Sequence, residues 1–391
     1  MDLFSQAQSL FDYTQALRRD FHRHPELAFH EVRTAGIVAA ELSKLGCEVK
    51  TGVAETGVVA TLTGKNPGPV VLLRFDMDAL PVQEENQVEY VSQTPGVMHA
   101  CGHDGHVAIG LTVARMLQTR QTELSGTVKF VFQPAEEGNG GARRMVEGGV
   151  LENPIPDYAL ALHLWNELPV GVVAVVPGPF MSGAGFFNVK IIGRGGHGAL
   201  PHQTADPVLA GAQIVNALQS IVSRNIPPLQ SGVVSVTQFH AGDAHNVIPP
   251  FAELNGTIRY FEENVHQIIL ERFHQVIDGV AGGMGCKAEI FIGDSTPPVV
   301  NDAWVVSQLQ DTFKQTIPEM QIDGNFRTMV SEDMAYMLQK VRGCYFMLGS
   351  ANHARGLDAG HHQPRFDFDE HVLPRAAALM AAGAIKLLDT E

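Results

Sequence analysis

Residues 70–81 read VVLLRFDMDALP, and this stretch decides how the rest of the chain is interpreted. The run VVLLRF is compact and β-branched at its start, as expected for a strand that is buried on both faces of a sheet. Open α/β sheets place their sites at the carboxyl ends of such strands. Here that end carries Asp76 and Asp78. The stretch therefore predicts an α/β fold with a polar site at the end of a buried strand.

Three further stretches place metal-binding residue types at similar positions. MHACGHDGH (98–106) holds three histidines, a cysteine and an aspartate just before an apolar, helix-like stretch. TVKFVF (127–132) is a buried strand that runs into QPAEEG, and YALALHL (158–164) is a third that ends near His163. Scattered core residues would not fall at strand ends so regularly, so we expect these residues to meet in one site.

The candidate ligands combine thiolate, imidazole and carboxylate groups: Cys101, His103, Glu137, His163 and one histidine of the pair His361 and His362. A catalytic zinc-type site needs about three protein ligands and an open position. A two-metal site clamps both the attacking water and the substrate oxygen. The set predicts a metal-dependent hydrolase site, whereas any single histidine is more often structural.

The adjacent carboxylates Glu136 and Glu137 add a possible base to this site. Neighbouring side chains on an extended segment point in opposite directions. One could then bind metal while the other takes a proton from the attacking water. A solvated acidic turn is the alternative, which the position directly after a buried strand makes less favourable. We expect Asp78 to hydrogen-bond a metal ligand or bridging group without binding the metal itself.

The region 185–296 has the pattern of an inserted domain, with 1–184 and 297–391 forming the catalytic domain. Its expected strands and helices alternate as β-α-β-β-α-β, the split βαβ or ferredoxin-like order, over 186–193, 206–224, 232–242, 251–261, 264–281 and 286–292. Its polar candidates for substrate contact are His197, His202, Asn246 and Arg259. Arg259 suits a substrate carboxylate, and a surface salt bridge is the alternative.

Elsewhere in the chain, helices are expected at 4–20, 31–45, 107–119, 303–316, 331–340 and 367–388, with strands at 57–62 and 344–349. The fold class is therefore α/β, with a mixed sheet flanked by helices in the catalytic domain.

Composition limits the other possibilities. The 391 residues carry a formal net charge of −15, which argues against nucleic acid because phosphate binding needs clustered Lys and Arg. No run approaches the 18 or more apolar residues of a membrane span, and the N-terminus lacks the pattern of a signal peptide. We expect a cytoplasmic protein without a disulfide framework among its four cysteines.

The motifs MHACGHDGH, QPAEEG, ALHL, GRGGHGALPH, HNVIP, GTIR and SEDMAY occur in this order. Together they closely resemble the aminoacylase/carboxypeptidase-G-type metallopeptidase family, within it the hippurate hydrolase and indole-3-acetyl-amino-acid hydrolase branch. The resemblance covers nearly the whole chain. It implies a two-metal catalytic domain and an inserted satellite domain that commonly dimerises.

Residue by residue, the resemblance implies five metal ligands: Cys101, His103, Glu137, His163 and His362. His362 is preferred to His361 because it aligns with the branch's single histidine before proline and the acidic helix start. The resemblance makes Glu136 the general base and Asp78 the aspartate that orients the site. It gives His197, Asn246 and Arg259 contacts to substrate, with the histidine stabilising an oxyanion across a dimer interface.

The implied activity is hydrolysis of N-acyl or N-aroyl amino acids by two divalent metal ions per subunit in a homodimer. Thiolate and imidazole favour zinc, and manganese, cobalt and nickel stay open. One alternative is an N-acetyl-diaminopimelate deacetylase or a small-peptide carboxypeptidase or dipeptidase that uses the same site. A second alternative, of another class, is a non-catalytic ligand-binding protein that has kept the fold.

Overall fold

The computed structural model describes residues 2–138, 140–293 and 296–390. The chain folds into two compact units. The large unit comprises residues 1–180, 300–327 and 333–391, and the insert unit comprises 181–299 and 328–332. The sequence-based domain bounds, 185 and 296, stay a prediction.

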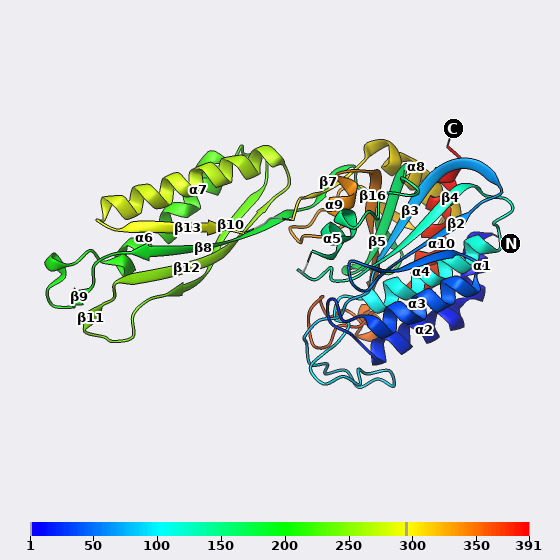
Figure 1. The fold of residues 1–391 in the computed structure, drawn as a ribbon, viewed down its shortest axis with the longest axis horizontal. Helices are drawn as coiled ribbons and strands as arrows, with labels where there is room; N and C mark the ends of the chain where they lie inside the picture. Colours follow the sequence, from blue (N-terminus) through cyan, green and yellow to red (C-terminus); the bar gives the residue numbers. More distant parts are fainter. Residues whose placement is uncertain (1, 139, 294–295, 391) are drawn as a thin grey trace. The chain divides into compact units, whose positions relative to one another are not determined.

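An eight-stranded mixed sheet forms the centre of the large unit (Figure 1). In spatial order its strands are β1 (Glu48–Val53), β2 (Gly57–Thr63), β4 (Ser125–Gln133), β3 (Asn66–Asp76), β5 (Tyr158–Pro169), β16 (Arg342–Ala351), β6 (Val172–Ala174) and β15 (Gln321–Asp323). The central strands β4, β3, β5 and β16 run parallel to one another. The compact apolar runs of the sequence are these central strands, and the expected mixed α/β sheet is confirmed.

Helices cover both faces of this sheet: α1 (Leu3–Ser9), α2 (Phe11–Arg23), α3 (Val32–Lys44), α4 (His103–Gln118), α5 (Gly141–Glu147), α8 (Ala303–Thr316), α9 (Ala335–Leu338) and α10 (Leu373–Leu388). Helices α4 and α10 pack on β3, while α5 and α9 contact β4 and β16 from the other side (Figure 1). Apolar side chains of β2, β3, β4, β5 and β16 form one core with α3, α4, α8 and α10.

Three helix predictions were wrong in extent. The helix expected over 367–388 begins only at Leu373, after the short helix Glu370–Val372. Residues 4–20 form two helices with Leu10 between them, because α1 packs on α10 whereas α2 packs on α4. The helix expected over 331–340 is limited to α9. The residues before α9 are held by tertiary hydrogen bonds and do not join the helix. The Asp333 carboxylate accepts from Gln133 Nε2 at 2.7 Å and from the Ala142 N–H at 2.8 Å.

Helix α10 is long and strongly apolar. The segment Glu370–Leu388 is long and apolar enough to cross a membrane, with a mean hydropathy of 1.3. However, 78% of this segment is buried inside the structure. The core helix of a globular protein meets the same length and composition criteria. Its burial against α1, α4 and α8 therefore identifies α10 as a core helix.

The insert unit has one four-stranded antiparallel sheet and two long helices. Its elements are β8 (Gly183–Ile192), α6 (Pro207–Ser220), β10 (Gly232–His240), β12 (Phe251–Tyr260), α7 (Glu263–Gly283) and β13 (Lys287–Ile292). The strand order is β10-β12-β8-β13, with every neighbouring pair antiparallel. This is the order of a split βαβ fold, as expected. A short two-stranded antiparallel sheet, β9 (Gly196–His197) with β11 (Val247–Ile248), extends beyond the four-stranded sheet.

The close approach of α4 to the sheet depends on glycine. A Cβ atom added at Gly110 would lie 2.7 and 2.8 Å from ring atoms of Phe75 and 2.9 Å from Phe132. Both rings are buried in the core, so neither can move aside freely. Gly110 therefore sets the distance between α4 and strands β3 and β4.

We predict that Gly110→Ala lowers stability by about 1–3 kcal/mol, the usual range for overpacking a core. Gly36→Ala in α3 is the matched control, because a Cβ there meets nothing within 4 Å. That change should be neutral or stabilising by about 0.5–1 kcal/mol. Urea unfolding followed by circular dichroism compares the midpoints. An unchanged midpoint for Gly110→Ala would contradict the packing argument.

Candidate active site

The candidate ligands converge at the carboxyl ends of the parallel strands. Strand β3 ends at Asp76, β4 ends at Gln133, and β5 carries His163 just beyond the last residue that pairs with β3. Helix α4 begins at His103, directly after the loop that carries Cys101. Because parallel strands end at one edge of a sheet, these side chains meet there.

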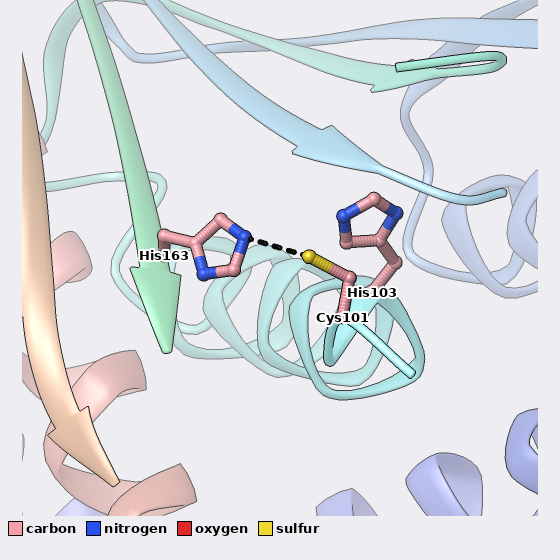
Figure 2. A group of neighbouring side chains, drawn as sticks. All are labelled: Cys101, His103 and His163. Carbon is pink, nitrogen blue, oxygen red and sulfur yellow. Dashed lines mark hydrogen bonds between the residues drawn. The ribbon is translucent and has the colours of Figure 1, made fainter. Parts of the chain in front are cut away.

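Two trios of potential ligands share Cys101. In each of the trios Cys101–His103–His163 and Cys101–Glu137–His362, the ligand atoms lie within 4.8 Å of one another. Figure 2 shows the Cys101 thiol between the imidazole rings of His103 and His163, with its sulfur 3.4 Å from His163 Nε2. The structure thus brings together all five ligands that the sequence proposed.

Hydrogen bonds fix which nitrogen of each imidazole faces the centre. His103 Nδ1 lies 2.9 Å from the carbonyl oxygen of Asp78 and donates to it, which leaves the buried Nε2 without a hydrogen-bond partner among the described residues. His163 Nδ1 likewise donates to the Leu164 carbonyl at 2.6 Å. Backbone acceptors on Nδ1 are the usual way to orient a metal-binding histidine. Both Nε2 atoms therefore face the centre, where they can bind a cation.

The second trio is tied to the first through Asp78. The backbone N–H of Glu137 donates to Asp78 Oδ2 at 3.0 Å. His362 Nε2 lies 3.2 Å from Glu137 Oε1, and the backbone N–H of His362 donates to the Ala100 carbonyl at 2.8 Å. Segments from β3, β4 and the C-terminal loop thus meet around one aspartate.

Electrostatics at the centre favour a cation. Burial raises the pKa of the Cys101 thiol well above its usual range, and the negative charges of Glu137 and Glu136 raise it further. Burial lowers the pKa of His103, but the carboxylates of Asp76 and Asp78 outweigh burial and raise it to about 10. A bound divalent cation reverses both preferences, because it stabilises thiolate and neutral imidazole. The sulfur, nitrogen and oxygen donors fit such an ion.

The general-base candidate Glu136 lies beside these ligands. Its carboxylate is within 4.8 Å of the ligand atoms of His103 and Glu137. The expectation that Glu136 and Glu137 continue an extended segment was wrong. Strand β4 ends at Gln133, and Ala135 with φ 54° turns the chain, so both glutamates lie in a turn.

Sequence reasoning missed the residue that holds this turn. The buried Glu31 accepts the Ala135 N–H through Oε1 at 3.0 Å and the Thr56 hydroxyl through Oε2 at 2.5 Å. Glu31 precedes α3, far from the strand ends in sequence. The only local signal was the last glutamate of HPELAFHE (24–31), which has no metal-binding spacing.

A second layer of polar residues lies behind the ligands. His106 Nδ1 lies 2.5 Å from Asp76 Oδ1, and His106 Nε2 accepts the Leu164 N–H at 3.0 Å. Arg74 Nη1 donates to Asp76 Oδ2 at 2.7 Å. Burial raises the pKa of Asp76, but His103, His106 and Arg74 together lower it well below its usual range. Asp76 therefore stays ionised and holds His106.

The first turn of α4 is anchored separately. Asp104 accepts from the fully buried Arg18 at 2.8 Å and lies 2.7 Å from His22 Nδ1. Burial opposes ionisation of Asp104, but Arg18 and His22 lower its pKa well below the usual range. Its role is to position the helix that begins with His103.

The candidate substrate residues lie in the insert unit. His197 and Asn246 are brought together by the two-stranded sheet β9–β11. In this sheet His197 pairs with Val247, and the Gly198 N–H donates to the Asn246 carbonyl at 2.8 Å. His202 lies in the exposed short helix Pro201–Gln203 that follows.

Arg259 lies elsewhere in the insert unit. It pairs with Ala184 at one end of β8, whereas the β9–β11 sheet follows Ile192 at the other end (Figure 1). Eight residues of strand span about 25 Å, so one insert unit does not bring Arg259 and His197 together. Among the described residues no carboxylate forms an ion pair with Arg259, which donates to the Ile258 carbonyl at 2.9 Å.

The chain is similar to known proteins over most of its length. The profile of peptidase family M20/M25/M40 matches residues 72–385. IAA-amino acid hydrolase ILR1-like 4 of Arabidopsis thaliana is 42% identical over 386 residues, which cover 97% of this chain and 86% of that protein. An N-acyl-L-amino acid amidohydrolase of Geobacillus stearothermophilus is 44% identical over 287 residues, which cover 73% of this chain and 77% of that protein.

A solved structure is similar over the whole length. The YXEP protein of Bacillus subtilis, described as a dinuclear metal binding peptidase from the M20 family, has 34% sequence identity and a TM-score of 0.86. The match covers 98% of this chain and 100% of that one. The chain belongs to peptidase family M20/M25/M40.

Proposed function

We propose that this chain hydrolyses the amide bond of N-acyl and N-aroyl amino acids to a carboxylic acid and a free amino acid. The observation that carries the proposal is the pair of ligand trios that share Cys101, with Glu136 beside them. The named relatives act on amides of amino acids, which agrees with this substrate class. The chain is a metal-dependent hydrolase of carbon–nitrogen bonds. Its cytoplasmic location stays a prediction.

The site fits two divalent metal ions. Cys101, His103 and His163 would hold one ion, and Cys101, Glu137 and His362 would hold the other. The combination of thiolate and imidazole donors favours zinc over manganese, cobalt or nickel. When bound, the ions supply Lewis acidity that polarises the amide carbonyl and lowers the pKa of water.

Glu136 moves the protons of the reaction. Its carboxylate takes a proton from the attacking water as the new carbon–oxygen bond forms, and returns it to the leaving nitrogen as the carbon–nitrogen bond breaks. The turn after β4 places this carboxylate within 4.8 Å of the ligand atoms of His103 and Glu137. Asp78 holds the His103 ring and the Glu137 backbone in place during these steps.

The insert unit supplies groups for the substrate. His197 Nδ1 accepts the Ala199 N–H at 3.0 Å, so in the neutral ring Nε2 carries the proton and suits an oxyanion. The guanidinium of Arg259 suits the substrate carboxylate, and Asn246 and His202 lie near His197 in the fold. About 25 Å of strand separates Arg259 from the β9–β11 sheet that carries His197. We therefore assign the contacts of Arg259 and His197 with one substrate to two subunits of a homodimer.

A hydrolysis screen tests the function. Purified protein loaded with zinc, manganese, cobalt or nickel is given N-acetyl, N-benzoyl and indole-acetyl amino acids, N-acetyl-diaminopimelate and dipeptides, and released amino acid is measured. We expect turnover of the N-acyl or N-aroyl amino acids that a chelator abolishes and added metal restores. Turnover of the diaminopimelate derivative or of dipeptides alone would overturn the substrate assignment. No chelator-sensitive turnover of any substrate would overturn the function.

Glu136→Gln tests the base. We expect kcat to fall by about 10²–10⁴-fold, the usual contribution of a general acid–base group, while metal content by elemental analysis stays unchanged. Glu167→Gln, at an exposed glutamate of β5, is the control and should keep full activity. Comparable activity in Glu136→Gln and wild type would refute the assignment.

Complementation between subunits tests the shared site. Glu136→Gln and His197→Ala should each be nearly inactive as homodimers. When the two variants are co-expressed and mixed subunits form at random, half of the dimers contain one intact site, so activity should recover to about a quarter of wild type. Failure to recover while mixed dimers are detected by mass spectrometry would place His197 in its own subunit's site or in none.

A further inference from the structure

His361 precedes the candidate ligand His362 and contacts the same thiol, yet the proposed mechanism gives it no task. Its Nδ1 lies 3.8 Å from Cys101 Sγ. The groups of potential ligands found among the described residues do not include His361. The contact can therefore serve a role other than metal binding.

The ring of His361 is held in one orientation. Trp165 stacks on it with ring centroids 4.4 Å apart and planes 24° apart, and Phe366 lies 4.8 Å away at 36°. The Asn166 side chain fixes the surrounding loop, since its Nδ2 donates to the carbonyls of Ala359 at 2.9 Å and Asp367 at 2.8 Å. A ring clamped in this way presents one fixed nitrogen to Cys101.

Its tautomer follows from the other nitrogen. The backbone N–H of Asn166 donates to His361 Nε2 at 3.2 Å, so Nε2 carries a lone pair. In a neutral imidazole the proton is then on Nδ1, the atom that faces Cys101. This is the reverse of His103 and His163, whose Nδ1 protons point to backbone carbonyls and whose Nε2 lone pairs face the centre.

We propose that His361 is a positioning residue that donates its Nδ1–H to the thiolate of Cys101 and does not itself bind metal. This inference rests on the proposed role of Cys101 as a metal ligand. A hydrogen bond from N–H to an ionised acceptor is stronger than a neutral one. It offsets the desolvation of a thiolate that has Glu136 and Glu137 nearby, and it draws electron density from the sulfur that both ions share.

The test uses His361→Phe, which keeps an aromatic ring between Trp165 and Phe366 but removes the donor. Cobalt-loaded protein reports on the thiolate through its sulfur-to-cobalt charge-transfer absorption band. We expect His361→Phe to bind two cobalt ions at saturation, with affinity lowered about 10–100-fold, as for other residues that hydrogen-bond metal ligands. The band should move to lower energy, because the sulfur becomes more electron-rich.

Two further variants make the result decisive. His361→Gln, which offers an amide donor, should return the band and the affinity toward wild type, whereas His362→Phe should lose one cobalt ion. Loss of one ion in His361→Phe would show that His361 is a ligand. An unchanged band and affinity would show that the contact has no role.

Failure of the underlying proposal has a different signature. If wild-type protein shows no sulfur-to-cobalt band, and Cys101→Ala leaves cobalt content unchanged, then Cys101 is not a ligand and the proposed centre is wrong. A wild-type band that is insensitive to His361 overturns only the inference about His361. Circular dichroism of each variant confirms that it is folded before the comparison is made.

Discussion

Asp78 ties together the segments that hold the candidate ligands. Its carbonyl accepts from His103, the first residue of α4, and its carboxylate accepts the backbone N–H of Glu137 in the turn after β4. Asp78 is buried and lies two residues beyond the end of β3. The end of one central strand therefore sets the distance between a helix start and a neighbouring turn, and the two ligand trios depend on that distance.

The sequence predicted the fold where burial alone determines structure. The central strands were found because each is a compact apolar run, and the order in the insert unit followed from alternating patterns. The family resemblance was also confirmed by the comparisons. Short strands such as β6 and β15, with three residues each, were missed because they carry too few residues to show a period. The split between α1 and α2 reflects which helix each packs on, which local spacing does not encode.

The residue types that form the site could be predicted from the sequence, but the residues that hold the ligands in place could not. The five proposed ligands lie together, although their individual roles stay predictions. Glu31 was not found because its partner Ala135 lies more than 100 residues away in sequence. The sequence indicated His361 only as an alternative ligand, because its contact with Cys101 is also remote in sequence. The turn at Ala135 was missed for another reason, since a non-glycine residue with positive φ leaves no clear mark in sequence.

Two adjacent histidines show why residue type cannot settle a ligand. His361 and His362 both approach the site, and spacing alone allows either to bind. The distinction comes from what each ring already does with its nitrogens. His361 accepts a backbone N–H at Nε2 and so turns a proton toward Cys101, whereas His362 Nε2 lies beside Glu137. A residue whose proton faces a thiolate tunes that sulfur, and a residue whose lone pair faces the centre can bind the ion. For His103, His163 and His361, the hydrogen bond on the far side of the ring therefore decides whether a lone pair or a proton faces Cys101.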